Sequence, residues 1–213
     1  MTKVTSVFIA DDHAIFREGL LRVLELSSDM RVSGMATNGR EVLQGATAGE
    51  HDVLLLDLNM PGPSGIELIK RMRSEAPSLP ILVMTVHNEA EIARRAIAAG
   101  AAGYLTKDSD PEVLHEAIHN VARGRNFVDR EIASKLLFHT SQEGDEQPHR
   151  FLSDREFDVF KRLAEGESIP MIATTLGISP KTVSTHKFRL MQKLGIETDG
   201  ELIRYALRNA LVQ

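Results

Sequence analysis

The sequence predicts two domains in a chain of 213 residues: a five-stranded, doubly wound parallel α/β sheet, followed by an all-α domain of four helices. Three observations favour this fold class. Short apolar runs alternate with amphipathic stretches from residue 4 to about residue 123, as they do in βαβ units. The stretch His139–Arg150 is polar and charged, which is typical of a linker. From Phe151 onward the periodicity is helical.

Five apolar runs are predicted as strands, because each is too short for a helix. The runs are Val7–Ile9, a weaker one at Met30–Ala36, Val53–Leu56, Ile81–Met84 and Gly103–Leu105. A stretch with helical periodicity follows each of them. These predicted helices span Ala14–Leu26, Gly39–Thr47, Ser64–Ser74, Glu89–Ala99 and Pro111–Arg123. Proline suits the first turn of a helix, where its fixed φ and missing N–H cost nothing.

The domain boundaries follow from these patterns. We expect a first domain at residues 1–125, a linker at 126–150 and a second domain at 151–213. A short helix at Glu131–Phe138 is expected before the polar part of the linker. The second domain is predicted to form helices at Asp154–Ala164, Ile169–Leu176, Pro180–Leu194 and Gly200–Asn209.

Composition excludes several classes of site. The chain has no cysteine, so disulfides, thiolate metal sites and cysteine nucleophiles are excluded. The first ten residues lack a signal-peptide pattern, and no apolar run approaches about 18 residues. We therefore expect a soluble, cytoplasmic protein with no membrane partner. The net charge is −5, yet residues 181–193 carry four basic side chains and no acid.

Five polar side chains follow four of the predicted strands. Asp11 and Asp12 come after the first strand and Asp57 after the third; Thr85 and Lys107 come after the fourth and fifth. Because the carboxyl ends of parallel strands meet at one edge of a sheet, we expect these side chains to converge. Three clustered carboxylates repel one another unless cations neutralise them. The sequence therefore predicts a Mg²⁺ site, to which Lys107 adds a compact positive charge.

This grouping suits phosphoryl transfer. Asp57 would attack phosphorus and form an aspartyl phosphate. The metal and Lys107 would neutralise the transferred oxygens, and the Thr85 hydroxyl would bond one of them. Taken singly, each residue has a structural alternative: Asp12 as a helix cap, Asp57 as a turn former, Thr85 as an ordinary strand end and Lys107 as a solvated lysine. Their positions at the ends of different strands favour the functional interpretation.

Four segments resemble, in order, the receiver domain of bacterial response regulators. They are Phe8–His13, Leu55–Gly62, Met84–Thr85 and Gly103–Lys107, and the resemblance covers roughly residues 4–123. It implies that a histidine kinase phosphorylates Asp57. One departure is Asp108, which stands where a proline often follows the lysine.

The resemblance also implies roles for the residues around Asp57. Asp12, Asp57 and the backbone carbonyl of Asn59 would bind Mg²⁺, and Asp11 would contact the metal through water. Thr85 and Tyr104 would form the switch pair, in which the hydroxyl turns to the phosphate and the ring packs inward. The resemblance further implies that the protein dephosphorylates itself slowly. It implies no turnover of an independent substrate.

In the second domain, Ala173, Gly177 and Val183 have the spacing of a helix-turn-helix. Ser179 is predicted to cap the following helix, with Pro180 at its first position. The same three positions also occur in small helical bundles that do not bind DNA. The basic residues of the following helix favour DNA, because phosphate contacts supply much of the affinity for it.

The second domain as a whole resembles LuxR-type DNA-binding domains. The matching segments include Leu152–Glu156, Ala164–Gly166, Leu176–Ser179, Thr182–Val183 and Lys193–Leu194. Together with the receiver, they identify the chain as a member of the NarL/FixJ family of response regulators. The third helix of the domain would then enter the major groove. Its candidate DNA contacts are Lys181, Thr182, Ser184, Thr185, His186, Lys187, Phe188, Arg189 and Lys193.

Three departures from the LuxR pattern predict weaker or differently specified DNA binding. The segment Ser168–Met171 replaces a polar run, so the second helix loses its capping box. Ser184 stands where a lysine is typical, which removes one expected phosphate contact. Asp199 stands where an arginine is usual, which places an acid near the last helix.

The function expected from the sequence is that of a phosphorylation-controlled transcription factor, homodimeric when phosphorylated or bound to promoter DNA. An aspartate-dependent phosphatase is the enzymatic alternative. Such sites usually carry a second acid two residues after the nucleophile, where this chain has Asn59. A regulator that binds proteins independently of phosphorylation is the third possibility.

Overall fold

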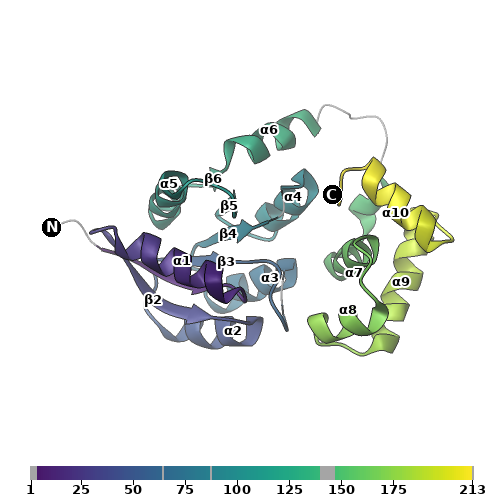
Figure 1. Ribbon diagram of the computed structural model, residues 1–213, viewed down its shortest axis with the longest axis horizontal. Coiled ribbons are helices and arrows are strands. Elements are labelled where there is room, and N and C mark those ends of the chain that lie inside the picture. The colour runs from purple at the N-terminus through teal and green to yellow at the C-terminus, as the bar shows by residue number, and fades with distance from the viewer. Residues whose placement is uncertain (1–3, 64, 87, 140–146, 213) are drawn as a thin grey trace. The chain divides into compact units, whose positions relative to one another are not determined.

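The computed structural model describes residues 4–63, 65–86, 88–139 and 147–212 (Figure 1). The chain divides into two compact units, Met1–Leu136 and Leu137–Gln213, so the division falls inside the segment expected to be the linker. Residues 140–146 of that expected linker lie outside the described residues. Within the described ranges, no helix is both long enough and apolar enough to cross a membrane.

The first unit contains a parallel sheet with the strand order β2-β1-β3-β4-β5-β6. Five of its strands are those predicted: β1 (Thr5–Ala10), β2 (Met30–Ala36), β3 (Val53–Leu56), β4 (Ile81–Thr85) and β5 (Gly103–Thr106). The prediction of five strands was wrong by one, because β6 (Phe127–Val128) pairs with β5 in the register Gly103↔Phe127. A strand of two residues is too short to produce an apolar run, so the periodicity of the sequence did not show it.

The helices of this unit lie within about two residues of the predicted ranges. They are α1 (Ala14–Glu25), α2 (Gly39–Ala48), α3 (Gly65–Glu75), α4 (Ala90–Ala98) and α5 (Pro111–Ala122), followed by α6 (Arg130–His139), which begins in this unit and ends just past the division. Ser64, the predicted first residue of the third helix, lies outside the described residues.

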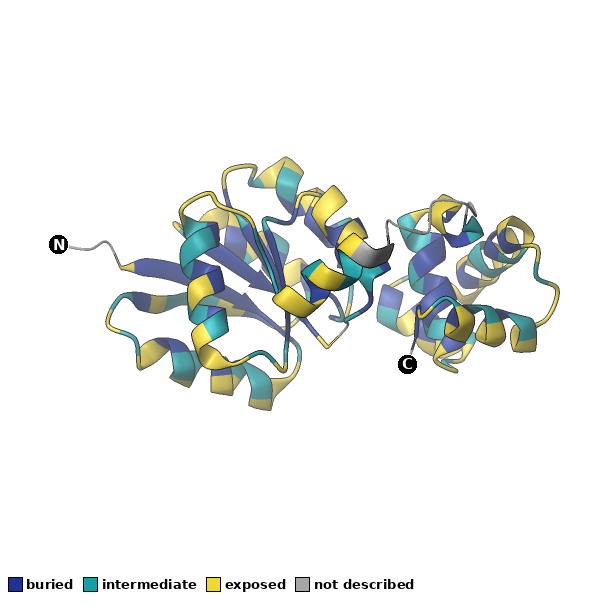
Figure 2. Cartoon of the chain, turned by 90° about the horizontal axis from the view of Figure 1, so that it is seen from above, coloured by how far each residue is buried: buried dark blue, intermediate teal, exposed yellow. Residues whose placement is uncertain are grey.

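Alternate residues of each strand face opposite sides of the sheet. Val7, Ile9 and Leu55 share one buried core with Leu24 of α1 and Ile118 of α5, so these two helices cover the same face. The intervening strand residues face the other side, where Phe8 lies against α2. Helix α3 contacts α2 and α4. Figure 2 shows buried strands between helices whose outer surfaces are exposed, which explains why the strands are almost continuously apolar.

The second unit is helical, with a 3₁₀ helix (Pro148–Phe151) followed by α7 (Asp154–Ala164), α8 (Ile169–Leu176), α9 (Pro180–Leu194) and α10 (Asp199–Arg208). Two capping boxes fix helix starts: Ser153 with Glu156 for α7, and Thr198 with Glu201 for α10. The apolar faces of the helices meet around Phe160, which is fully buried.

Gly39, the first residue of α2, fixes the loop that follows β3. Its N–H donates to the carbonyl of Pro61 at 3.0 Å. A Cβ at this position would lie 1.6 Å from the carbonyl oxygen of Pro63. Only glycine therefore allows α2 to begin against this loop, whose first residues follow Asp57.

We expect Gly39→Ala to destabilise the first unit by about 1–3 kcal/mol, because helix and loop must separate to admit the methyl group. Urea unfolding checks this. Gly19→Ala is the matched control: Gly19 lies inside α1 with open space around it, so that exchange should stabilise by about 0.5–1 kcal/mol. Equal effects of the two exchanges would contradict the proposed contact.

Candidate functional site

The site begins where β1 and β3 end side by side. The register pairs Ala10 with Leu56, so the next residues, Asp11 and Asp57, lie at adjacent strand ends. The N–H of Asp57 donates to the carbonyl of Ala10 at 2.9 Å. Both aspartates are buried. This is the switch point of the sheet, since the chain leaves β1 toward β2 on one side and returns to β3 on the other.

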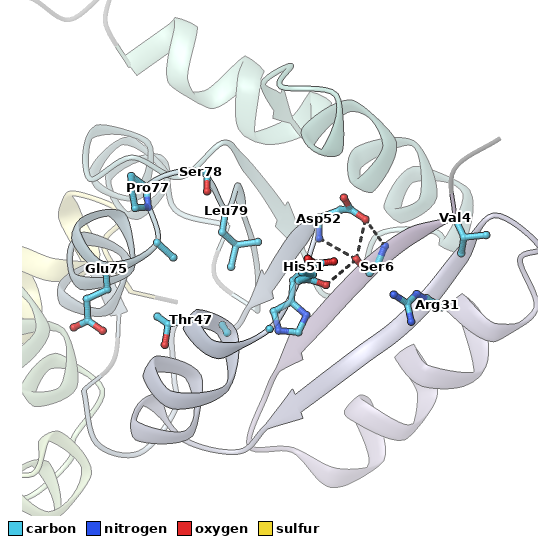
Figure 3. A pocket seen from close by; sticks show the side chains of 14 residues that line it. Val4, Ser6, Arg31, Thr47, His51, Asp52, Glu75, Pro77, Ser78 and Leu79 are labelled. Atoms are coloured by element: carbon cyan, nitrogen blue, oxygen red, sulfur yellow. Dashed lines mark hydrogen bonds between the residues drawn. The ribbon is translucent and has the colours of Figure 1, made fainter. Parts of the chain in front are cut away.

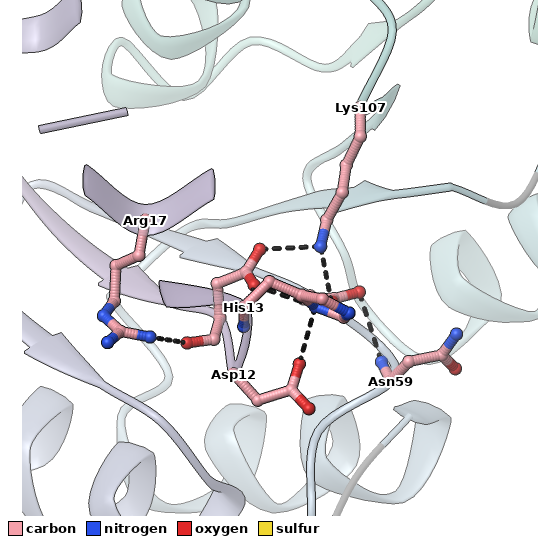
Figure 4. A network of polar contacts seen from close by, with 7 residues as sticks. Asp12, His13, Arg17, Asn59 and Lys107 are labelled. Carbon is pink, nitrogen blue, oxygen red and sulfur yellow. Dashed lines mark hydrogen bonds and ion pairs between the residues drawn. The ribbon is translucent and has the colours of Figure 1, made fainter. Parts of the chain in front are cut away.

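Lys107 bridges the two buried carboxylates (Figure 4). Its Nζ lies 2.7 Å from Oδ2 of Asp11 and 2.8 Å from Oδ2 of Asp57. The Lys107 N–H donates to the carbonyl of Thr85 at 2.8 Å, which fixes the backbone just after β5. The ammonium also lies 4.6 Å from the ring centre of Phe16. The lysine is therefore a buried counter-ion and not a solvated surface group.

Asp12 lies beside this pair, and its structural alternative is wrong. The N-cap of α1 is His13, and Asp12 makes no capping bond there. The Asp12 Oδ1 atom is buried without a hydrogen-bond partner of acceptable geometry, although His13 Nδ1 lies 2.9 Å away. Ligand atoms of Asp11, Asp12, His13 and Asp57 all lie within 4.8 Å of one another. These four residues form an acidic pocket.

Asp57 combines both of the roles considered for it. Its Oδ1 accepts the N–H of Asn59 at 3.2 Å, as a turn-forming aspartate does. Its Oδ2 faces Lys107. Burial raises the pKa of Asp57 above its ordinary value, and the nearby Asp11 adds to the rise, against the opposing effect of Lys107.

Lys107 remains charged in this setting. Burial alone would lower its pKa, but hydrogen bonds to Asp11 and Asp57 raise it above the ordinary value. The pocket thus holds the carboxylates of three aspartates, and the Lys107 ammonium pairs with two of them. The pocket carries an excess of negative charge, which favours binding of a further cation.

Thr85 and Tyr104 lie on the neighbouring strands. Thr85 ends β4, pairs in register with Thr106 of β5 and is fully buried. Tyr104 is also fully buried. Burial raises the pKa of its hydroxyl, and the charges of Glu89 and Asp57 raise it further. The ring therefore packs inside the unit.

Sequence reasoning missed two supporting residues. His13 contributes a ring nitrogen to the pocket. Arg17 lies one helical turn later. It donates from Nη1 to the carbonyl oxygen of Asp11 at 2.7 Å and so holds the backbone of Asp11 in place (Figure 4). The sequence offered only a partial signal, because Arg17 lies one helical turn after His13, the N-cap of α1.

A separate cavity of about 550 Å³ opens near the amino ends of the strands (Figure 3). Two of its polar side chains, Ser6 and Asp52, bond each other. Asp52 Oδ2 accepts the N–H and the hydroxyl of Ser6, each at 2.8 Å. These hydrogen bonds within the protein have a structural role, whereas the pocket at Asp57 concentrates negative charge.

In the second unit, α8 and α9 form the predicted helix-turn-helix. Gly177 ends α8 in the left-handed region at φ 64°, and the N–H of Ile178 donates to the carbonyl of Ala173. The Ser179 side chain caps α9 by accepting the N–H of Thr182. Val183 is fully buried. The loss of the α8 capping box is confirmed, because Ser168 makes no side-chain capping bond.

The candidate DNA contacts of α9 fall into three sets: exposed side chains, lysines paired with an acid, and one half-buried histidine. Lys181, Thr182, Ser184, Thr185, Phe188 and Arg189 are exposed. Lys187 lies 2.6 Å from Asp199, whose carboxylate therefore neutralises one charge of the basic stretch. Lys193 lies 2.6 Å from Glu156 of α7 and also bonds the Phe151 carbonyl. His186 is half-buried.

Comparison with known proteins decides the family. Residues 7–119 match the model of the "response regulator receiver domain", and residues 150–206 match "bacterial regulatory proteins, luxR family". The response regulator UvrY of Escherichia coli K12 is 33% identical, over 97% of this chain and 95% of its own length. The oxygen regulatory protein NreC of Staphylococcus carnosus is 34% identical, over 97% and 98%. The chain belongs to the NarL/FixJ family of response regulators.

Solved structures agree with this assignment. A structure of RcsB from Salmonella typhimurium is 31% identical to this response regulator, with a TM-score of 0.76, over 97% of this chain and 98% of that one. RcsB from Salmonella enterica serovar Typhimurium, bound to promoter rprA in the presence of the phosphomimetic BeF3⁻, is 32% identical with a TM-score of 0.70. That match covers 94% of this chain and 97% of the other.

We expect His186 to contribute stability to the LuxR-type domain of this regulator that is lost as pH falls below about 6.5, the ordinary pKa of histidine. The reason is that burial lowers the pKa of His186, as do the charges of Arg155 and Arg189. Its buried Nδ1 has no hydrogen-bond partner among the described residues. When folding lowers the pKa of a histidine, the stability that this group contributes is fully present above its pKa in the unfolded chain. That stability is lost as pH falls through its pKa in the folded protein.

Chemical unfolding at several pH values between about 5 and 7, followed by a probe in residues 151–213, measures this loss. The glutamine of His186→Gln cannot titrate, so the unfolding free energy of this variant should fall less than that of the wild type as the pH is lowered. The same slope in both proteins would contradict the role given to His186.

Proposed function

We propose that this response regulator is a transcription factor switched by phosphorylation of Asp57. The observation that supports it best is the buried Asp57 carboxylate, held 2.8 Å from Lys107 at the switch point of the sheet. A histidine kinase is the proposed donor. The bond from phosphorus to the kinase's histidine nitrogen breaks, and a bond from phosphorus to an oxygen of Asp57 forms. Lys107 then neutralises charge on the transferred oxygens.

The pocket suits Mg²⁺, which we propose as its cofactor. Asp12 and Asp57 would bind the metal with the Asn59 carbonyl, and Asp11 would contact it through water. The excess of carboxylates and the buried Asp12 Oδ1 without a hydrogen-bond partner support this choice, because hard divalent cations prefer oxygen ligands. When bound, Mg²⁺ would supply positive charge at the transferred phosphoryl oxygens.

The switch that follows phosphorylation is proposed to use Thr85 and Tyr104. The Thr85 hydroxyl would turn to the phosphoryl oxygens, and the Tyr104 ring would remain packed inward behind it. Turnover of an independent substrate is not proposed, because Asn59 stands where phosphatases of this type carry their second acid. Slow attack of water on the phosphorylated Asp57 would return the protein to its resting state.

Promoter DNA is the proposed target of α9, and a homodimer is the proposed DNA-bound form. RcsB, which this chain resembles over nearly its whole length, has been solved as two dimers bound to two parallel DNAs. The exposed face of α9, with Lys181, Ser184 and Arg189, supports the same role here. Residues 1–125, 126–150 and 151–213 would serve as receiver, linker and DNA-binding domain, in the cytoplasm where promoter DNA is accessible.

The phosphorylation site is tested by incubation with a small phosphodonor and Mg²⁺, followed by intact-mass analysis. Wild type should gain one phosphoryl group, and Asp57→Ala should gain none. Asp108→Ala is the matched control, since it removes a carboxylate just outside the pocket, and should be labelled like wild type. Equal labelling of wild type and Asp57→Ala would exclude the proposed site.

DNA binding is tested through the pair formed by Lys187 and Asp199. Asp199→Asn frees the Lys187 ammonium for a phosphate, so affinity should rise about two- to fivefold, as expected for an exposed ion pair. The slope of log K against log salt should steepen by about one unit. Glu197→Gln removes an equal charge from the same turn and should change affinity less. Undetectable or salt-insensitive binding to DNA would favour the alternative of a protein-binding regulator.

A further inference from the structure

A second cluster of metal-ligating side chains lies at the other end of the sheet from Asp57. Asp29 directly precedes β2, in the turn that follows α1. His115 and His119 are one helical turn apart on α5, so both rings project from one face of that helix. Because α1 and α5 pack on the same face of the sheet (Figure 1), the fold brings the turn and the two histidines together.

The ligand atoms of this cluster converge. The Nε2 atom of His119 lies 2.8 Å from Oδ2 of Asp29, and that of His115 lies 3.2 Å from Oδ1. The three ligand atoms all lie within 4.8 Å of one another. In a tetrahedral zinc site with bonds of about 2.0–2.1 Å, neighbouring ligands stand about 3.3 Å apart. The present separations therefore need little adjustment to surround an ion.

We propose that Asp29, His115 and His119 form a Zn²⁺ site, with water as the fourth ligand. Two imidazoles and one carboxylate are ligands typical of zinc sites with an open position. Mg²⁺, which prefers an all-oxygen set, suits the pocket at Asp57 instead. The Ser27 hydroxyl bonds Asp29 and would orient the carboxylate from outside the ligand set. Its 2.8 Å contact with Nε2 of His115 would be replaced by the bond from that nitrogen to the metal.

The site is accessible and partly preformed. The side chains of Asp29, His115 and His119 are 36%, 38% and 25% exposed, so an ion can enter from solvent. The two rings already stand edge to face, with centres 4.7 Å apart. Binding would join the α1–β2 turn to α5 across 86 residues of sequence. Zinc should therefore raise the thermal midpoint of the first unit, by more at higher zinc concentration.

Calorimetric titration of the full-length chain with Zn²⁺, in excess Mg²⁺ to occupy the pocket at Asp57, tests the proposal. Wild type should bind one ion, and Asp29→Asn and His119→Gln should each weaken this binding at least about tenfold. Glu116→Gln is the matched control: it removes a carboxylate from the exposed face of α5 beside the histidines and should bind like wild type.

A second measurement uses the wild type alone and so does not depend on how the variants fold. Modification of histidines by diethyl pyrocarbonate, located by mass spectrometry, should be slowed by Zn²⁺ at His115 and His119. No zinc binding by wild type, equal affinity in wild type and Asp29→Asn, or unprotected modification of both histidines would overturn the proposal. The cluster would then be a hydrogen-bonded tie between the turn and α5.

Discussion

The first unit must compensate the repulsion between two buried carboxylates, and the arrangement of its strands meets this constraint. Asp11 and Asp57 lie at neighbouring strand ends because β1 and β3 pair in register. Burial strengthens their repulsion, and the cation that opposes it arrives from β5, beyond the intervening strand β4. The pocket therefore depends on the assembled sheet, and a slip of one strand would separate Lys107 from its partners.

The lysine also links the pocket to the rest of the sheet. Its backbone N–H is bonded to Thr85 at the end of β4, and Tyr104 lies three residues earlier on β5. A change of charge on Asp57 thus acts on the ammonium that holds these strand ends together. Small movements at one end of the sheet have a direct route to its outer strands.

Much of the fold was predictable because its signals are local. Buried strands of four or more residues, such as Val53–Leu56, produce apolar runs, and Pro180 after Ser179 marks a helix start. The sixth strand was not predicted, because a strand of two residues is too short to show a periodic pattern in the sequence. Convergence of Asp11, Asp57 and Lys107 was also predictable, since parallel strands place their carboxyl ends together.

What the sequence did not show depends on contacts between distant residues. A run of basic side chains in one helix says nothing of the acids that other helices bring to it, and Glu156 and Asp199 pair with Lys193 and Lys187 from α7 and α10. In the same way, the spacing of His115 and His119 fixes a shared face of α5 but not their neighbour Asp29. These pairings appear only when the packing is known.

The ion pair between Lys187 and Asp199 has a consequence for how a promoter would respond to this regulator. A carboxylate paired with one of the basic groups of α9 would lower the affinity of a single DNA-binding unit for DNA. If two weakly binding chains must meet on one site, occupancy rises with the square of the concentration of active chains. Occupancy of the promoter would then stay near zero at low signal and increase steeply beyond a threshold.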